Sequence, residues 1–137
     1  PLTVVGDANA NQPNYYKQCT EFAGDHVNFI PHQSRKNVLK LMQAHRLLIV
    51  PSFFETYSIV AWEAAALGLN VIANDVPDMH ETLADISQLC DFTNEERTLK
   101  TISNNLLYGP SQQQKSQAWF ENYTWDAIGL QLEKAYQ

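Results

Sequence analysis

Short apolar runs alternate with longer amphipathic segments along the chain. The runs are rich in β-branched residues and lie at Leu2–Val5, Val27–Ile30, Leu47–Val50, Asn70–Ala73 and Gln88–Phe92. Strands that read as continuous apolar runs are typical of a parallel sheet that helices cover on both faces. The pattern therefore predicts an α/β domain in which a parallel sheet is flanked by helices.

Helices are expected between these strands. The segment Arg35–His45 shows the amphipathic spacing most clearly, with Val38, Leu41 and Met42 on one face. Further helices are predicted at Pro13–Ala23, Ile59–Leu67, Met79–Ala84 and Trp125–Tyr136. Two capping boxes, Thr93 with Glu96 and Ser111 with Gln114, predict helix starts. Because ligands of parallel sheets bind at the carboxyl ends of the strands, the loops after the strands are the place to look for a site.

Composition narrows the class of function. The chain has 137 residues, a formal net charge of -6 and a pI near 5.0. This charge argues against binding nucleic acid or an anionic membrane surface. Cys19 and Cys90 lack metal or redox spacing and suggest free thiols in a reducing cytoplasm. We expect a single domain, residues 1–137, without a membrane span.

The segment from Pro51 to Ala73 carries the most specific chemistry. A loop with Glu55 leads to a helix that is predicted to begin after Ser58 as N-cap and to contain Glu63. The free N–H groups and partial positive charge of a helix N-terminus suit a phosphate. Glu63, about one turn further on, is then placed to accept hydrogen bonds from a ribose diol, and Glu55 to face a sugar. The segment thus predicts a nucleotide-sugar site.

These residues resemble the C-terminal, donor-binding domain of a GT-B glycosyltransferase of family 4, also called group 1. The two glutamates have the family's E-x7-E spacing. The other matching residues are Pro51, Ser52, Tyr57, Ala64, Gly68 and the strand Val71–Ala73. The resemblance begins at Val4 and extends to Phe120–Trp125, which is similar to a closing "F-S-W" segment. It implies a three-layer Rossmann-like domain.

The family resemblance also implies roles for individual residues. Glu55 contacts donor-sugar hydroxyls as the catalytic glutamate, Glu63 holds the ribose, and the backbone of Thr56, Tyr57, Ser58 and Ile59 holds the diphosphate. Pro31 and His32 follow the second strand, where the family places its nucleotide base. The reaction implied is a cytoplasmic sugar transfer that retains anomeric configuration, needs no metal or other cofactor in the protein, and takes a nucleotide sugar as donor.

The resemblance implies missing parts as well. An earlier strand lies in the middle of the family's sheet, and the loop after it carries an Arg and a Lys that clamp the diphosphate. The family's N-terminal half binds the acceptor. Nothing in this sequence corresponds to either part, so we expect a fragment of a larger two-domain enzyme that is inactive alone. The alternatives are a nucleotide-sugar epimerase of the same fold and a non-catalytic nucleotide-sugar-binding domain.

Simpler interpretations exist for the candidate residues. A helix-surface position would also account for Glu63 and a solvated loop for Glu55, but the binding roles are favoured for both. For His32 the solvated loop is the favoured interpretation. A capping bond from the Ser58 hydroxyl to a helix N–H is the simplest role for that side chain. The three tryptophans, Trp62, Trp119 and Trp125, are most simply core or interdomain packing.

Overall fold

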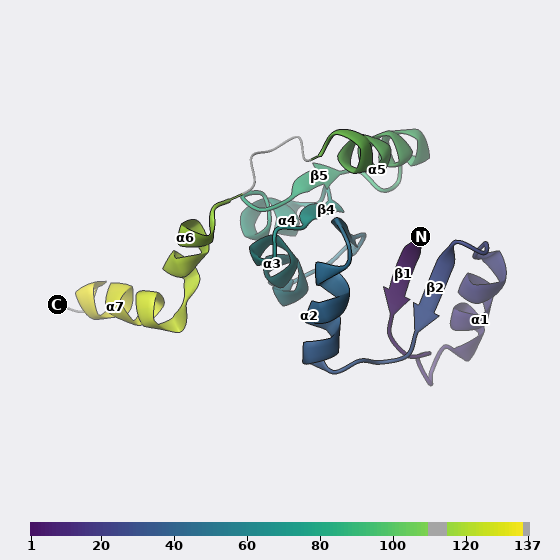
Figure 1. The fold of residues 1–137 in the computed structure, drawn as a ribbon, viewed down its shortest axis with the longest axis horizontal. Coiled ribbons are helices and arrows are strands. Elements are labelled where there is room, and N and C mark those ends of the chain that lie inside the picture. The colour runs from purple at the N-terminus through teal and green to yellow at the C-terminus, as the bar shows by residue number, and fades with distance from the viewer. Residues whose placement is uncertain (110–114, 136–137) are drawn as a thin grey trace. The chain divides into compact units, whose positions relative to one another are not determined.

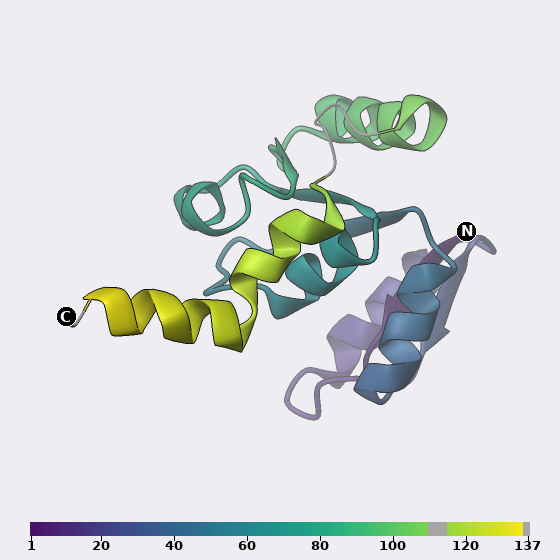
Figure 2. The same cartoon turned by 60° about the vertical axis from the view of Figure 1, so that its left-hand side comes forward.

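A computed structural model describes residues 1–109 and 115–135 of the chain (Figures 1 and 2). The chain divides into two compact units, Pro1–Lys40 and Leu41–Gln137. The boundary falls inside helix α2 (Arg35–Gln43). Each unit is described below by itself.

The first unit is built on a β–α–β motif. Strands β1 (Leu2–Val5) and β2 (Val27–Ile30) are parallel and in register from the pair Leu2–Val27 to the pair Val5–Ile30. Helix α1 (Pro13–Phe22) connects them and begins with proline, whose fixed φ suits the first helical position. Tyr16 of α1 packs edge-on against Phe29 of β2, with ring centroids 5.7 Å apart. This contact fixes the helix on one face of the two strands.

The second unit contains a three-stranded parallel sheet. Strand β4 (Asn70–Asn74) lies between β3 (Leu47–Val50) and β5 (Gln88–Cys90), and all five of its residues are buried. Helix α3 (Ile59–Ala66) contacts β3 and β4, and α5 (Glu95–Tyr108) contacts β5. The side chains with no more than 1% exposure form the core: Ala61, Ala64, Ile72, Ala73, Met79, Leu83 and Cys90. The core of this unit is therefore formed by α3, β4, α4 with the turn after it, and β5.

All strand pairs are parallel, which confirms the predicted α/β class with a Rossmann-like arrangement of strands and helices. Among the described residues, however, the strands form two sheets, β1–β2 and β3–β4–β5, rather than one.

The remaining elements are α4 (Pro77–Thr82), α6 (Gln117–Phe120), the 3-10 helix η1 (Glu121–Tyr123) and α7 (Trp125–Ala135). Strand β5 ends at Cys90, two residues before the predicted end, and α4 begins before the predicted Met79. In the part of the chain that the structure describes, no helix has both the length and the apolar character that crossing a bilayer requires.

The predicted capping box at Thr93 is wrong. The N-cap of α5 is Asn94, whose side chain accepts the Arg97 N–H at 3.0 Å. Thr93 is occupied elsewhere, because its N–H and its hydroxyl both bind the Asp91 carboxylate. The second predicted box, Ser111 with Gln114, lies outside the described residues.

Candidate functional site

The loop between β3 and α3 carries most of the predicted site residues. It leaves the carboxyl end of β3 at Val50 and enters α3 at Ile59. Ala61 and Ala64, three residues apart on α3, are fully buried. Such small side chains let a helix backbone lie close to a sheet, and α3 contacts both β3 and β4.

Glycine ends α3 and returns the chain to the sheet. Gly68 has φ +86°, in the left-handed region that side-chain-bearing residues rarely adopt. The Gly68 N–H donates to Ala65 O and the Leu69 N–H to Ala64 O, the two bonds of a Schellman motif. These hydrogen bonds end the helix at its C-terminus, and the β3–α3 loop leads into its N-terminus.

Ser58 occupies the predicted N-cap position in an unexpected conformation. Its φ of 51° and ψ of 64° are left-handed, and its hydroxyl makes no capping bond. A capping side chain reaches the helix amides from an extended backbone, so the predicted hydroxyl cap is wrong. Instead Ser58 is 5% exposed, and its Oγ lacks a hydrogen-bond partner among the described residues.

Replacing Ser58 by glycine is expected to raise the free energy of unfolding by about 1 kcal/mol. Glycine removes the strain of a side-chain-bearing residue in the left-handed region, and it removes a buried hydroxyl that has no partner. The greater conformational freedom of glycine in the unfolded chain opposes these gains but is smaller than they are. Urea unfolding followed by circular dichroism measures the change. Ser58→Ala is the matched comparison, because it removes the hydroxyl and keeps the strain. Lower stability of the glycine variant than of the alanine variant would contradict the strain argument.

The two glutamates lie where the sequence places them. Glu55 is a half-buried loop residue whose Oε1 accepts the Thr56 N–H at 3.1 Å. Glu63 is half-buried in the second turn of α3. At the first turn, the amides of Ile59 and Val60 have no acceptor within a helix. Among the described residues, no acceptor outside the helix is found for these two amides either. Donors at the helix start are thus bracketed in sequence by two carboxylates.

Aromatic and apolar residues neighbour these polar groups in the sequence. Phe53, Phe54 and Ile59 are all at least two-thirds exposed. The Tyr57 ring, by contrast, stacks on Trp62 of α3, with centroids 5.6 Å apart and planes 3° from parallel. The backbone of Tyr57 remains in the loop that is predicted to bind phosphate, while its ring is used for packing.

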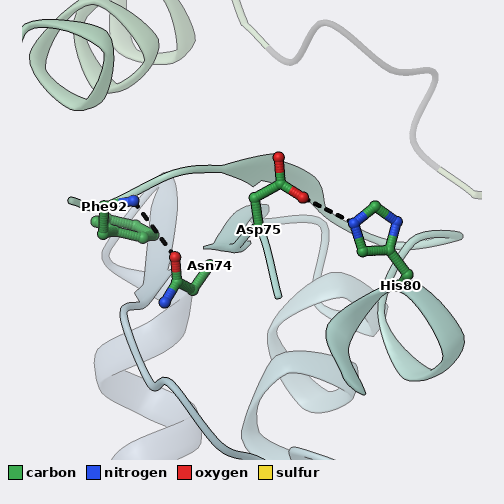
Figure 3. A network of polar contacts seen from close by, with 4 residues as sticks. All are labelled: Asn74, Asp75, His80 and Phe92. Atoms are coloured by element: carbon green, nitrogen blue, oxygen red, sulfur yellow. Dashed lines mark hydrogen bonds and ion pairs between the residues drawn. The ribbon is translucent and has the colours of Figure 1, made fainter. Parts of the chain in front are cut away.

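Asn74 joins the ends of all three strands of the second sheet. Asn74 is 2% exposed, and its Nδ2 donates to Ser52 O at 3.3 Å. Its Oδ1 accepts the Phe92 N–H at 3.3 Å (Figure 3). One buried amide therefore holds the loops after β3 and β5 against the end of β4. The sequence shows only a polar residue at a strand end, so this role was not predicted.

Further polar contacts lie at the same strand ends. The Asp75 Oδ1 accepts a hydrogen bond from His80 Nε2 at 2.7 Å (Figure 3). After β5, the Asp91 carboxylate accepts hydrogen bonds from Thr93. The bond from the Thr93 hydroxyl and, to a smaller extent, the bond from its N–H hold the pKa of the Asp91 carboxyl below its usual value. Both carboxylates are used to order the loops, and neither was singled out from the sequence.

Pro31 and His32 lie in the first unit, in the exposed loop after β2. The His32 N–H donates to Asp7 Oδ1 at 2.9 Å, so this loop is joined to the loop after β1. The proposed contact of Pro31 and His32 with a nucleotide base stays a prediction. Among the described residues, no three His, Cys, Asp or Glu side chains gather in a way that would hold a metal ion. Cys90 is buried and Cys19 half-buried, and both are free thiols.

Comparison with known proteins agrees with the family resemblance. A family model described as "Glycosyl transferases group 1" matches residues 1–124. Among curated proteins, the chain is similar to D-inositol 3-phosphate glycosyltransferases. That of Mycolicibacterium smegmatis is 39% identical over 61 residues, which cover 44% of this chain and 14% of the relative.

Two more relatives carry the same description. The protein of Mycobacterium sp. strain KMS is 31% identical over 94 residues, 67% of this chain and 21% of the relative. That of Mycobacterium leprae is 41% identical over 59 residues, 43% of this chain and 14% of the relative. The matched part of the chain thus spans 14% to 21% of the length of these three relatives.

Proposed function

We propose, because the chain belongs to the group 1 glycosyltransferase family, that it is the donor-binding part of a retaining glycosyltransferase. The parent enzyme would transfer a sugar from a nucleoside diphosphate sugar to a hydroxyl acceptor in the cytoplasm. The acceptor would be held by an N-terminal domain of the same protein. No metal or cofactor is assigned to the protein in this proposal.

The start of α3 is the observation that carries this proposal. The helix begins at the carboxyl end of a parallel strand, the usual position for a ligand in such a sheet. Its first amides, those of Ile59 and Val60, are available to an anion, and the helix dipole adds positive potential there. Ser58, the residue directly before these amides, has a left-handed backbone conformation.

In the proposed reaction, negative charge develops on the diphosphate as its bond to the sugar breaks. Hydrogen-bond donors that are already in place stabilise such charge without having to reorganise. The amides of Tyr57, Ser58 and Ile59 would fill this role, because the Thr56 N–H is already donated to Glu55. The Glu63 carboxylate would accept hydrogen bonds from the ribose hydroxyls, and Glu55 would orient the donor sugar. The Oε1 of Glu55 already accepts the Thr56 N–H, so its other oxygen would face the sugar.

We propose that the parent protein adds the parts that this segment lacks. An additional strand would extend the parallel sheet, and the loop after that strand would bring an Arg and a Lys to the diphosphate. Parallel strands are stable when both of their edges and both of their faces are covered. In this chain, by contrast, Leu2, Val4 and Val5 of β1 are 38% to 50% exposed.

The 137-residue chain alone is expected to bind a nucleoside diphosphate no more tightly than the order of millimolar, about 4 kcal/mol. One exposed helix N-terminus contributes only about 0.3–1 kcal/mol per charge interaction. The net charge of -6 opposes an anionic ligand. Titration with uridine, guanosine and adenosine diphosphates and their sugar conjugates, followed through the backbone amides of Glu55–Glu63, measures binding.

Several results of this titration are informative. Shifts confined to Glu55–Glu63 that weaken with added salt support the proposed site, since exposed electrostatic contacts are screened. Micromolar affinity or sugar transfer by the chain alone would contradict the expected need for the missing parts. Unchanged amide resonances at millimolar concentrations of all three diphosphates would count against the site itself.

A further inference from the structure

Five aromatic residues connect the C-terminal part of the second unit to the candidate site. We call Tyr57, Trp62, Trp119, Phe120 and Tyr123 the aromatic stack. The first two come from the β3–α3 loop and α3, and the other three from α6 and η1. The ring of Trp62 contacts each of the other four, at centroid distances of 4.8 to 6.4 Å. Trp62 is therefore the centre of the group.

Two of these contacts are nearly parallel. Trp62 stacks on Tyr57 at 5.6 Å with planes 3° apart, and on Trp119 at 5.9 Å with planes 8° apart. At these centroid distances the rings are offset, an arrangement that aromatic pairs favour. Tyr57 is the residue before the left-handed Ser58 and two residues after Glu55. The stack thus holds the loop at Tyr57, directly beside its left-handed residue.

A cation anchors the far side of the stack. The Lys115 Nζ lies 4.8 Å from the centre of the Trp119 ring and 3.7 Å from Asp85 Oδ1. An ammonium group over a tryptophan face is attracted by the ring electrons, and the carboxylate fixes the ammonium. Trp119 is consequently held both by neighbouring rings and by a charge pair that begins in the turn after α4.

We propose that Trp62 and Trp119 are positioning residues for the loop Glu55–Ser58. Trp119 supports the ring of Trp62, and Trp62 supports the ring of Tyr57, which keeps Ser58 in its left-handed conformation and the first amides of α3 directed outward. The segment Lys115–Tyr123 is then a brace for the candidate site. Its consequence for donor binding rests on the function proposed above, whereas its consequence for the order of the loop does not.

Amide hydrogen exchange in the 137-residue chain tests this positioning. The informative amides are those of Ala61 and Trp62, because both donate to Ser58 O. Trp119→Ala is expected to speed their exchange about tenfold, the effect of losing one or two ring contacts. Exchange of Ile72 in the buried strand β4 should stay the same. Trp125→Ala is the matched control, since Trp125 is 88% exposed and outside the stack.

Each result either supports or overturns the proposal. Equal exchange of Ala61 and Trp62 in the Trp119→Ala and Trp125→Ala proteins overturns it. If Trp119→Ala unfolds the chain, Trp119→Phe decides instead. This variant keeps a smaller ring and should speed the exchange of Ala61 and Trp62 relative to the Trp125→Ala protein while leaving that of Ile72 unchanged. A rise at Ile72 as large as at Ala61 in the phenylalanine variant shows a merely structural role and overturns the proposal.

Titration with uridine diphosphate tests the link to binding. Trp119→Ala is expected to raise the dissociation constant about threefold to tenfold, with no change for Trp125→Ala. Faster exchange at Ala61 with an unchanged dissociation constant overturns the link to binding. If the unmodified chain binds none of the uridine, guanosine and adenosine diphosphates, the proposed function fails. The exchange of Ala61 and Trp62 then still decides whether the stack positions the loop.

Discussion

Replacing Asn74 by leucine is expected to lower the free energy of unfolding by about 2–3 kcal/mol. Leucine has a similar volume but leaves Ser52 O and the Phe92 N–H without the bonds that the Asn74 amide gives them. Each loss of a buried partner costs about 1–3 kcal/mol, and the two losses share one side chain. Chemical unfolding of the two proteins, monitored by circular dichroism, measures the difference.

Two further variants isolate the hydrogen bonds of Asn74. Asn74→Asp keeps the acceptor for Phe92 and loses the donor for Ser52, so a substantial part of the loss should remain. Asn104→Leu on the exposed face of α5 is the control. It should change stability by no more than about 0.5 kcal/mol, as is usual for surface positions. Equal effects of leucine at positions 74 and 104 would show that the bridge contributes nothing.

Glu63→Gln is expected to weaken nucleoside diphosphate binding by the intact parent protein by about 1–3 kcal/mol, the range for hydrogen bonds to a charged group. The amide keeps the shape of the carboxylate and removes its charge. It can accept from one ribose hydroxyl but no longer offers two charged acceptors. Isothermal titration with the preferred diphosphate measures the change, and the melting temperature shows whether the fold is kept.

The specificity of that effect needs a second glutamine variant. Glu96→Gln lies in the first turn of α5, where a carboxylate also faces a helix N-terminus but is not part of the candidate site. It should leave affinity unchanged. Unaltered affinity in the Glu63→Gln protein as well would favour the alternative in which Glu63 is an ordinary residue of a helix surface.

Strands and helices were predicted well because their patterns are local. The predicted bounds of the first three strands, Leu2–Val5, Val27–Ile30 and Leu47–Val50, are those of the structure. Buried parallel strands require continuous apolar runs, and few other elements do. Helix α3 was also predicted to within one residue, since Ser58 and Gly68 lie just outside its ends. The family resemblance gave the chemistry of the segment, but not its geometry.

Features that depend on distant partners were not predicted. Ser58 was expected to cap α3 because serine usually does so, yet the left-handed backbone directs its hydroxyl into the interior. Trp62 and Trp119 were expected only to pack, because nothing in the sequence relates α3 to a segment so far along the chain. The bridge made by Asn74 likewise depends on two loops that the sequence does not align with each other.

The complete burial of Ala61 and Ala64 has a consequence for conformational entropy. Long side chains at such a contact would let a helix rock on its support, whereas two methyl groups against β4 leave it little room to move. Groups on α3 are therefore held in place before any ligand arrives. A ligand that binds to them loses its own freedom but need not restrict the protein further, which keeps the entropic cost of association low.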